Sequence, residues 1–259
     1  MNQIKKIFLT ALLAFSIVSC ASSIKEKFGA DDFGMGYLNP NAKITTEVDN
    51  LFANLSDVKT KVPDSIKPIS NEPINKIEKG LKQKIENVIT NGNSQQLITF
   101  LEAYNIFKTE SIEYPQLKVE LGDKQIENDT KTANSLLKRV YKLKGSVTVS
   151  KRLIERANQD VVSIKEKNDP VKVAGISMIT VTVLNNTLSA STESEKLSKE
   201  LQKFTDTLQA EIKAEPALSI KLSGIISEMG NASKELATVT TDIPQLLEST
   251  NKLIDSINS

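Results

Sequence analysis

Apolar residues recur at steps of three and four along most of this chain, which is the spacing of one buried helix face. The two longest runs of this kind occupy the C-terminal half, over 133–164 and 218–257. The first run comprises Ala133, Leu136, Val140, Leu143, Val147, Ser150, Ile154, Ala157, Val161 and Ile164. The second comprises Leu218, Leu222, Ile225, Met229, Ala232, Leu236, Val239, Ile243, Leu246, Thr250, Leu253 and Ile257. Each run keeps its phase throughout and therefore predicts a long helix with a heptad seam.

Several local signals modify these long helices. Residues 145–149 are poor helix formers, so a local strand or kink is an alternative there, but the unchanged phase on both sides favours helix. Thr192 and Glu195 have capping-box spacing, which predicts a helix start. Pro216 predicts a break, and Pro244 is expected to kink the last helix or to restart it.

Shorter helices are expected before residue 115. A periodic apolar face over 45–61 predicts the first of them. Pro63, Pro68 and Pro73 follow within 11 residues. Because proline lacks a backbone donor and also restricts the residue before it, these three positions predict a semi-rigid connector and exclude a continuous helix.

A second short helix is predicted by an apolar stripe over 74–89, which Asn91, Gly92 and Asn93 would end. A third is expected over 94–112. The loop between these two is only a few residues long, so they should form an antiparallel hairpin.

The most apolar stretch after the N-terminal segment is 171–184. Asp169 is expected to cap a helix there, with Pro170 at its first position. Its many β-branched residues leave a strand as an alternative. A stretch of 14 residues containing Lys172 is too short to span a bilayer as a helix, so a buried central helix is the default. The alternative resembles, in architecture, the apolar hairpin or tongue of some helical pore-forming toxins.

These elements predict an all-α fold, an elongated bundle of about five to seven helices with long antiparallel members and coiled-coil-like seams. The helical domain would cover 44–259. Its shorter helices would lie within 44–115 and its long-helix bundle within 123–259.

Composition narrows the chemistry. The chain has no histidine, so an imidazole base, a histidine-ligated zinc and an imidazole pH switch are excluded. Its 33 basic and 32 acidic side chains nearly balance, which does not indicate a nucleic-acid partner. The chain is therefore not expected to be an enzyme, and we expect no metal and no other cofactor.

A cluster of basic residues lies on the first long helix. Its members are Lys138, Arg139, Lys142, Lys144, Lys151, Arg152 and Arg156. One interpretation is a binding patch for sulfated glycans or acidic proteins. A solvated helix face, neutralised by acidic residues elsewhere in the bundle, is favoured. Phe204 is the single aromatic residue after Tyr141, which argues against a stacking platform for nucleic acid.

The N-terminus carries an export signal. Two lysines precede an apolar run over 7–18, which is too short to span a bilayer, and a cysteine follows it. The residues Ile17, Val18, Ser19 and Cys20 resemble the lipobox of bacterial lipoproteins.

This resemblance implies cleavage before Cys20 and acylation of that residue, so that 1–19 is a signal peptide and 20–43 a lipidated tether. Ala21 in place of an aspartate resembles an outer-membrane destination. Two or three acyl chains would anchor the protein stably in the cell envelope. The expected function is a non-catalytic structural or interaction protein, including a surface adhesin with protein or glycan partners. The alternative is a helical pore-forming or membrane-remodelling protein that uses 171–184.

Overall fold

A computed structural model describes residues 40–91, 115–119, 122–167 and 169–259, with side chains described from residue 45 onward except at 163 and 165–167. The lipobox, Cys20 and the helix expected over 94–112 lie outside these residues, as does the hairpin expected from that helix. Every secondary-structure element within the described residues is a helix. The predicted all-α class is therefore confirmed.

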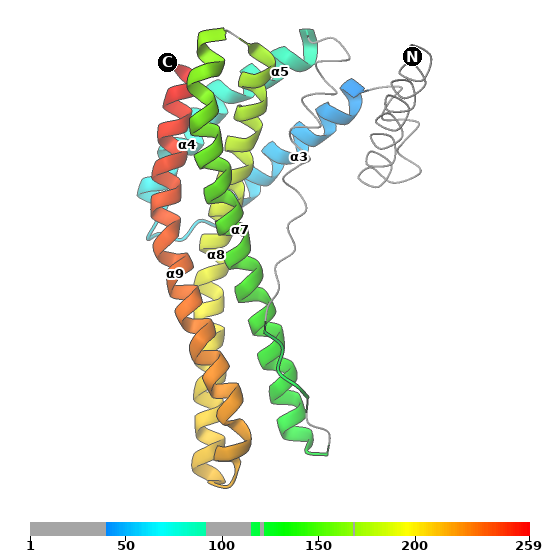
Figure 1. Cartoon of the computed structure of the whole chain (residues 1–259), viewed down its shortest axis with the longest axis vertical. Coiled ribbons are helices and arrows are strands. Elements are labelled where there is room, and N and C mark those ends of the chain that lie inside the picture. Colours follow the sequence, from blue (N-terminus) through cyan, green and yellow to red (C-terminus); the bar gives the residue numbers. More distant parts are fainter. Residues whose placement is uncertain (1–39, 92–114, 120–121, 168) are drawn as a thin grey trace, which may run out of the picture.

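Three long helices form the body. They are α7 (Lys124–Lys167), α8 (Pro170–Ala214) and α9 (Leu218–Asn258), and they run up, down and up along the long axis (Figure 1). Each packs against the other two. With 45 residues, α8 is about 68 Å long at 1.5 Å per residue. The result is an elongated bundle with long antiparallel members, as the heptad seams predict.

Both predicted seams are buried. All ten positions of the first seam are buried, and so are eleven of the twelve in the second, Leu218 being half-buried. Helix α7 runs through 145–149 without a strand, because Gly145 and Val147 lie on its buried side. The regular burial of the seam outweighs the poor helix propensity of these residues.

Side-chain caps set two of the long-helix starts. Asp169 Oδ1 accepts hydrogen bonds from the backbone nitrogens of Val171 (3.1 Å) and Lys172 (3.2 Å), with Pro170 following in the first turn. At the start of α7, Asp123 Oδ1 accepts from the backbone nitrogen of Gln125 at 3.1 Å. Gly122 precedes it with φ +117°, a conformation that L side chains rarely adopt. The predicted cap at Asp169 is confirmed.

The apolar stretch 171–184 forms the first third of α8 and is buried in the core. Ala174, Met178, Val181 and Leu184 are each 0% exposed. The central-helix prediction is confirmed and the strand alternative is wrong. Among the described helices, α8 alone is long and apolar enough to cross a membrane, but 67% of the apolar window is buried inside the protein.

The helix start predicted at Thr192 is wrong, because α8 continues through it. Thr192 Oγ1 donates to the carbonyls of Leu188 and Lys61 and does not cap a helix. The break at Pro216 is confirmed, since α8 ends at Ala214 and α9 begins at Leu218. Pro244 lies exposed within α9 and does not restart it.

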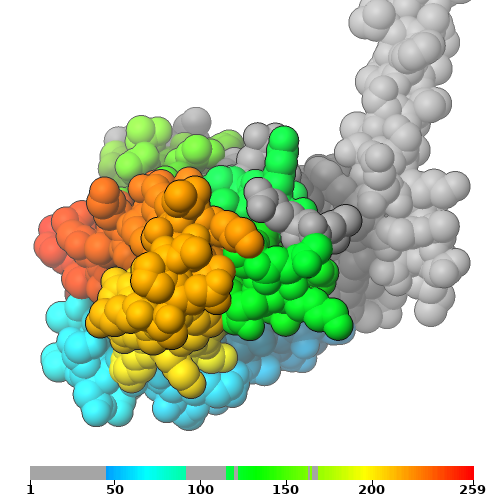
Figure 2. All heavy atoms as spheres, turned by 90° about the horizontal axis from the view of Figure 1, so that it is seen from below, coloured from blue at the N-terminus to red at the C-terminus, as the bar shows by residue number. Residues whose placement is uncertain are grey.

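The described short helices pack on one side of the upper half of the bundle, against α8 and α9 (Figure 1). They are α3 (Pro40–Thr60), α4 (Lys67–Lys76), the π-helix η1 (Ile77–Leu81) and α5 (Lys82–Asn91). The end-on view in Figure 2 shows their blue and cyan atoms beside the yellow atoms of α8. In α3 the predicted face is buried at Val48, Leu51 and Leu55.

The proline-rich connector is shorter than predicted. The non-helical link ends at Ile66, and helix α4 contains both Pro68 and Pro73. Pro68 lies in the first turn, where no backbone donor is needed. Pro73 is buried, and the carbonyl that it leaves without a helical donor belongs to Ile69, an exposed residue.

Candidate functional site

The seven basic residues of α7 do not form one continuous face. Arg139 is directed at α8, while Lys144 and Lys151 pair with α9. Lys138, Lys142 and Arg152 are exposed, and Arg156 lies 4.0 Å from Asp160 on its own helix. The basic cluster predicted from the sequence therefore consists of side chains that have different surroundings in the fold.

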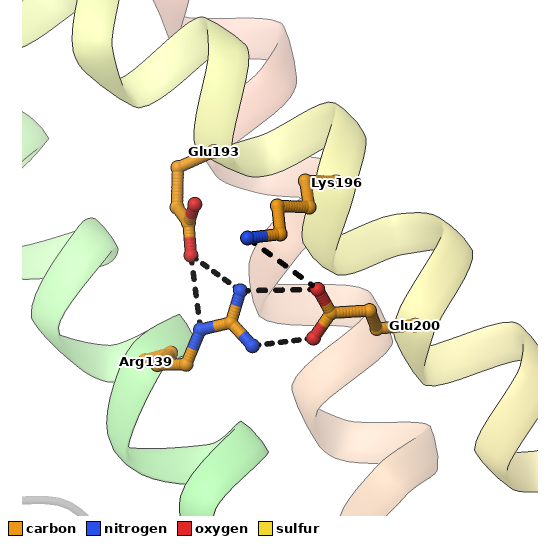
Figure 3. Close-up of polar contacts among 4 residues, drawn as sticks. All are labelled: Arg139, Glu193, Lys196 and Glu200. Carbon is orange, nitrogen blue, oxygen red and sulfur yellow. Dashed lines mark hydrogen bonds and ion pairs between the residues drawn. The ribbon is translucent and has the colours of Figure 1, made fainter.

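Arg139 is the best-organised member of the cluster (Figure 3). Its Nε and Nη2 atoms donate to Glu193 Oε1 at 2.9 and 2.6 Å. Its Nη1 and Nη2 atoms donate to the two carboxylate oxygens of Glu200, so that the guanidinium joins two turns of α8. Lys196 Nζ lies 4.0 Å from Glu200 Oε1 on the outer side. This fork geometry suits arginine and not lysine.

The electrostatics of this network favour the charged forms. The hydrogen bonding that Arg139 donates to Glu200 is the main cause that raises the pKa of Arg139 and also the main cause that lowers the pKa of Glu200. The three side chains are 31–37% exposed, so water still screens them. The network fixes the register of α7 against α8 and holds no uncompensated charge for a reaction.

Two further lysines join α7 to α9. Lys144 Nζ lies 2.7 Å from Glu235 Oε2, and Lys151 Nζ lies 2.6 Å from Asp242 Oδ1. These pairs and the Arg139 network support the interpretation of a neutralised helix face. The anion-binding interpretation is left with the exposed residues Lys138 and Lys142.

A polar contact that the sequence did not indicate holds the end of α9. Lys76 Nζ contacts Asp255 Oδ1 at 2.6 Å, and Lys84 Nζ donates to the carbonyl of Ile257 at 2.9 Å. The π-helix brings Gly80 against Asn258, where a Cβ atom would lie 3.2 Å from the side-chain oxygen. A cation at a helix C-terminus is favourable, but partners more than 170 residues apart leave no local sequence signal.

We next consider metal-binding groups and surface hollows among the described residues. These residues contain no group of three or more His, Cys, Asp or Glu side chains that could hold a metal ion. A shallow, open hollow on the outer face of α8 is lined by polar side chains such as Lys199, Gln202 and Asp206. The charged side chains of this hollow are all exposed to solvent.

Comparisons with known proteins add no assignment, because no protein-family model, curated protein or solved structure matches this chain.

Proposed function

We propose that this protein is a lipoprotein of the bacterial cell envelope, anchored through Cys20, whose helical body acts as a non-catalytic structural or interaction module. The observation that carries the proposal is the basic-flanked apolar run that ends in Ile17, Val18, Ser19 and Cys20. It is the one motif in the chain with a defined chemical outcome. Two or more acyl chains on the mature N-terminus would hold the protein on a membrane without a spanning helix.

The body suits a role as a rigid spacer that presents helix faces. Its long helices share continuous buried seams, and ion pairs join α7 to both neighbours. Such packing would hold the two ends of the bundle at a fixed separation, a role that needs no reactive group. The chain has no histidine, and its described residues contain no group of three or more His, Cys, Asp or Glu side chains that could hold a metal ion. Fewer catalytic mechanisms are therefore open to it.

Partners would be met on the exposed helix faces. An acidic protein or a sulfated glycan could contact Lys138 and Lys142, which α7 exposes one turn apart. Adhesion to a surface is one form that such an interaction takes. An outer-membrane location follows from the lipobox and from Ala21 after the anchor.

The anchor is tested by replacing the cysteine. Cys20→Ala should abolish incorporation of labelled palmitate and move the protein from the membrane to the soluble fraction. Ser22→Ala, which lies beyond the lipobox, is the matched control and should keep both properties. If Cys20→Ala stayed in the membrane fraction without detergent, another anchor would have to be sought. Protease treatment of intact cells then tests surface exposure, since a surface protein is cut and a periplasmic one is protected.

A second candidate function, membrane insertion by α8, is favoured by one observation. Residues 173–192 contain no Asp, Glu, Lys or Arg, and 20 helical residues reach about 30 Å, the thickness of a bilayer core. The hydroxyl groups of Ser177, Thr180 and Thr187 donate to carbonyls of their own helix and so need no other partner. Dye leakage from vesicles treated with the unlipidated Cys20→Ser protein would support membrane insertion. If the vesicles stayed intact, this second function would be rejected and the spacer role retained.

A further inference from the structure

Two carboxyl groups meet between the start of α7 and the end of α8. Asp129, on α7, is 6% exposed, and Glu211, on α8, is half-buried. Gln125 Nε2 bridges them, donating to Glu211 Oε1 at 2.8 Å and to the Asp129 oxygens at 3.3 and 3.4 Å. The two carboxyl groups therefore lie on either side of one amide nitrogen. A direct hydrogen bond between them requires a proton on one of them.

The charged groups around the pair do not neutralise it. Just before α7, Asp123 adds a further negative charge, and on α9, Lys221 Nζ lies 3.3 Å from Asp123 Oδ2. Lys118, Lys124, Lys213 and Glu215 near this end are exposed, and the half-buried Glu127 forms an ion pair with Lys131. Within the described residues, no lysine or arginine forms an ion pair with Asp129 or Glu211. Glu211 Oε2 is buried and has no hydrogen-bond partner among those residues.

The electrostatic consequence has the same direction for both groups. Burial is the main cause that raises the pKa of Asp129 and the charge of Asp123 adds to it, while the polar contacts with Gln125 and Glu211 lower it. Burial is also the main cause that raises the pKa of Glu211, followed by the charge and the polar contact of Asp129, while Gln125 lowers it. Like charges at close range disfavour the doubly ionised pair.

We propose that Asp129 and Glu211 form an acid-closed latch, in which a proton shared between the two carboxyl groups joins the first turns of α7 to the last turns of α8. Loss of this proton on going to neutral pH loosens that end of the bundle. The described short helices lie along the other half (Figure 1), so this end depends on contacts among the three long helices and on the segment 115–119, which is hydrogen-bonded to α7 through Asn134. Loosening would expose Ile126 and Leu208, which are buried here.

The direction of the pH effect follows from linkage. Both folded pKa values lie above the reference values of 3.8 and 4.5. The stabilising contact is therefore fully present below those reference values. It is lost as the pH rises through the raised folded values, so acidification tightens this end.

Hydrogen exchange of the full mature chain tests the latch, with protection factors corrected for the intrinsic pH dependence of exchange. From about pH 7.5 to about pH 4, near the reference values, protection at 124–134 and 207–214 should rise by about threefold or more, relative to the opposite end at 246–258. Glu211→Gln replaces the proton with an amide donor, so protection at neutral pH should reach the acid value and lose its pH dependence. Asp129→Asn should act in the same way. Glu195→Gln, in an exposed pair with Lys199 on the same helix, is the control and should keep the wild-type pH response.

Two outcomes would overturn the proposal. One is a wild-type protein whose two ends respond equally to pH. The other is a pH response that survives in both Glu211→Gln and Asp129→Asn. Because either amide variant alone can show the loss of pH dependence, a folding defect in one of them leaves the test decisive.

Discussion

At the scale of single residues, burial and partner geometry separate side chains that look equivalent in the sequence. Leu236 and Lys234 are neighbours on α9, but Leu236 is 3% exposed within the seam while Lys234 points to solvent. Arg139 and Lys138 are adjacent on α7, but Arg139 alone bridges two glutamates. The position on the helix face decides what each side chain contributes.

Leu236→Ala should therefore destabilise the protein strongly. Truncation removes buried apolar contacts and leaves a partial cavity, with an expected loss of roughly 2–5 kcal/mol. Lys234→Ala should change stability by less than about 0.5 kcal/mol. Both variants introduce alanine, so helix propensity changes little between them, and denaturant unfolding measures the difference. Equal and negligible shifts of the two midpoints would show that α9 does not pack within one chain.

Arg139→Met should lose the network while keeping the apolar stem of the side chain. We expect a loss of about 1 kcal/mol, because Glu193 and Glu200 remain partly hydrated when the guanidinium is removed. Lys199→Met, which breaks an exposed pair with Glu195, should cost much less. The cost of Arg139→Met should also shrink at high salt, since screening already weakens the exposed ion pairs. Thermal unfolding at two salt concentrations measures both effects, and equal costs for the two variants would rule out a special role for Arg139.

At the scale of elements, helix ends are specified more locally than helix interiors. Asp169 begins α8 through two backbone hydrogen bonds, and Pro216 separates α8 from α9. By contrast, α8 continues through Thr192, and α4 continues through Pro73. In both cases packing against neighbouring helices outweighs a local signal for a helix end.

Asp169→Ala removes the cap of the most buried helix. The backbone nitrogens of Val171 and Lys172 lose their acceptor, with an expected cost of about 1 kcal/mol. Asp169→Ser keeps a capping oxygen and should recover most of that stability. Calorimetric melting compares the three proteins, and a serine variant as unstable as the alanine variant would mean that the carboxylate acts through another contact.

At the scale of the whole molecule, three long helices with shared seams make a rod whose upper half is covered by the described short helices. The buried apolar residues of the described helices form one core that extends along the rod. Its length places the two ends of the bundle in different surroundings, one covered by α3–α5 and the other carrying Asp129 and Glu211.

Small-angle X-ray scattering of residues 41–259 checks this shape. A compact domain of that length has a radius of gyration of about 17 Å. The helical rod should give a clearly larger value, with a pair-distance distribution skewed towards long distances. A symmetric distribution near the compact value would contradict the extended bundle.

Local patterns were sufficient to predict the helical class, the two seams, the cap at Asp169 and the break at Pro216. Periodicity, capping and proline geometry act within a few residues, so one chain contains this information. The sequence also predicts that acidic residues elsewhere in the bundle neutralise the basic residues on α7, but it does not identify those acidic residues. The lipobox is likewise readable in the sequence as a lipidation signal, and lipidation of Cys20 stays a prediction.

The partners depended on the tertiary fold. Arg139 meets Glu193 and Glu200, Lys84 meets the end of α9, and Asp129 meets Glu211, across 54 to 173 residues of chain. An apolar seam shows which face of a helix is buried, but hydrophobic contact is non-directional and does not name the neighbour. Until the order and register of the helices are set, the same charges are compatible with many pairings. For this reason the basic residues of α7 could be recognised in the sequence, whereas only the tertiary fold showed that Asp129 and Glu211 lie together.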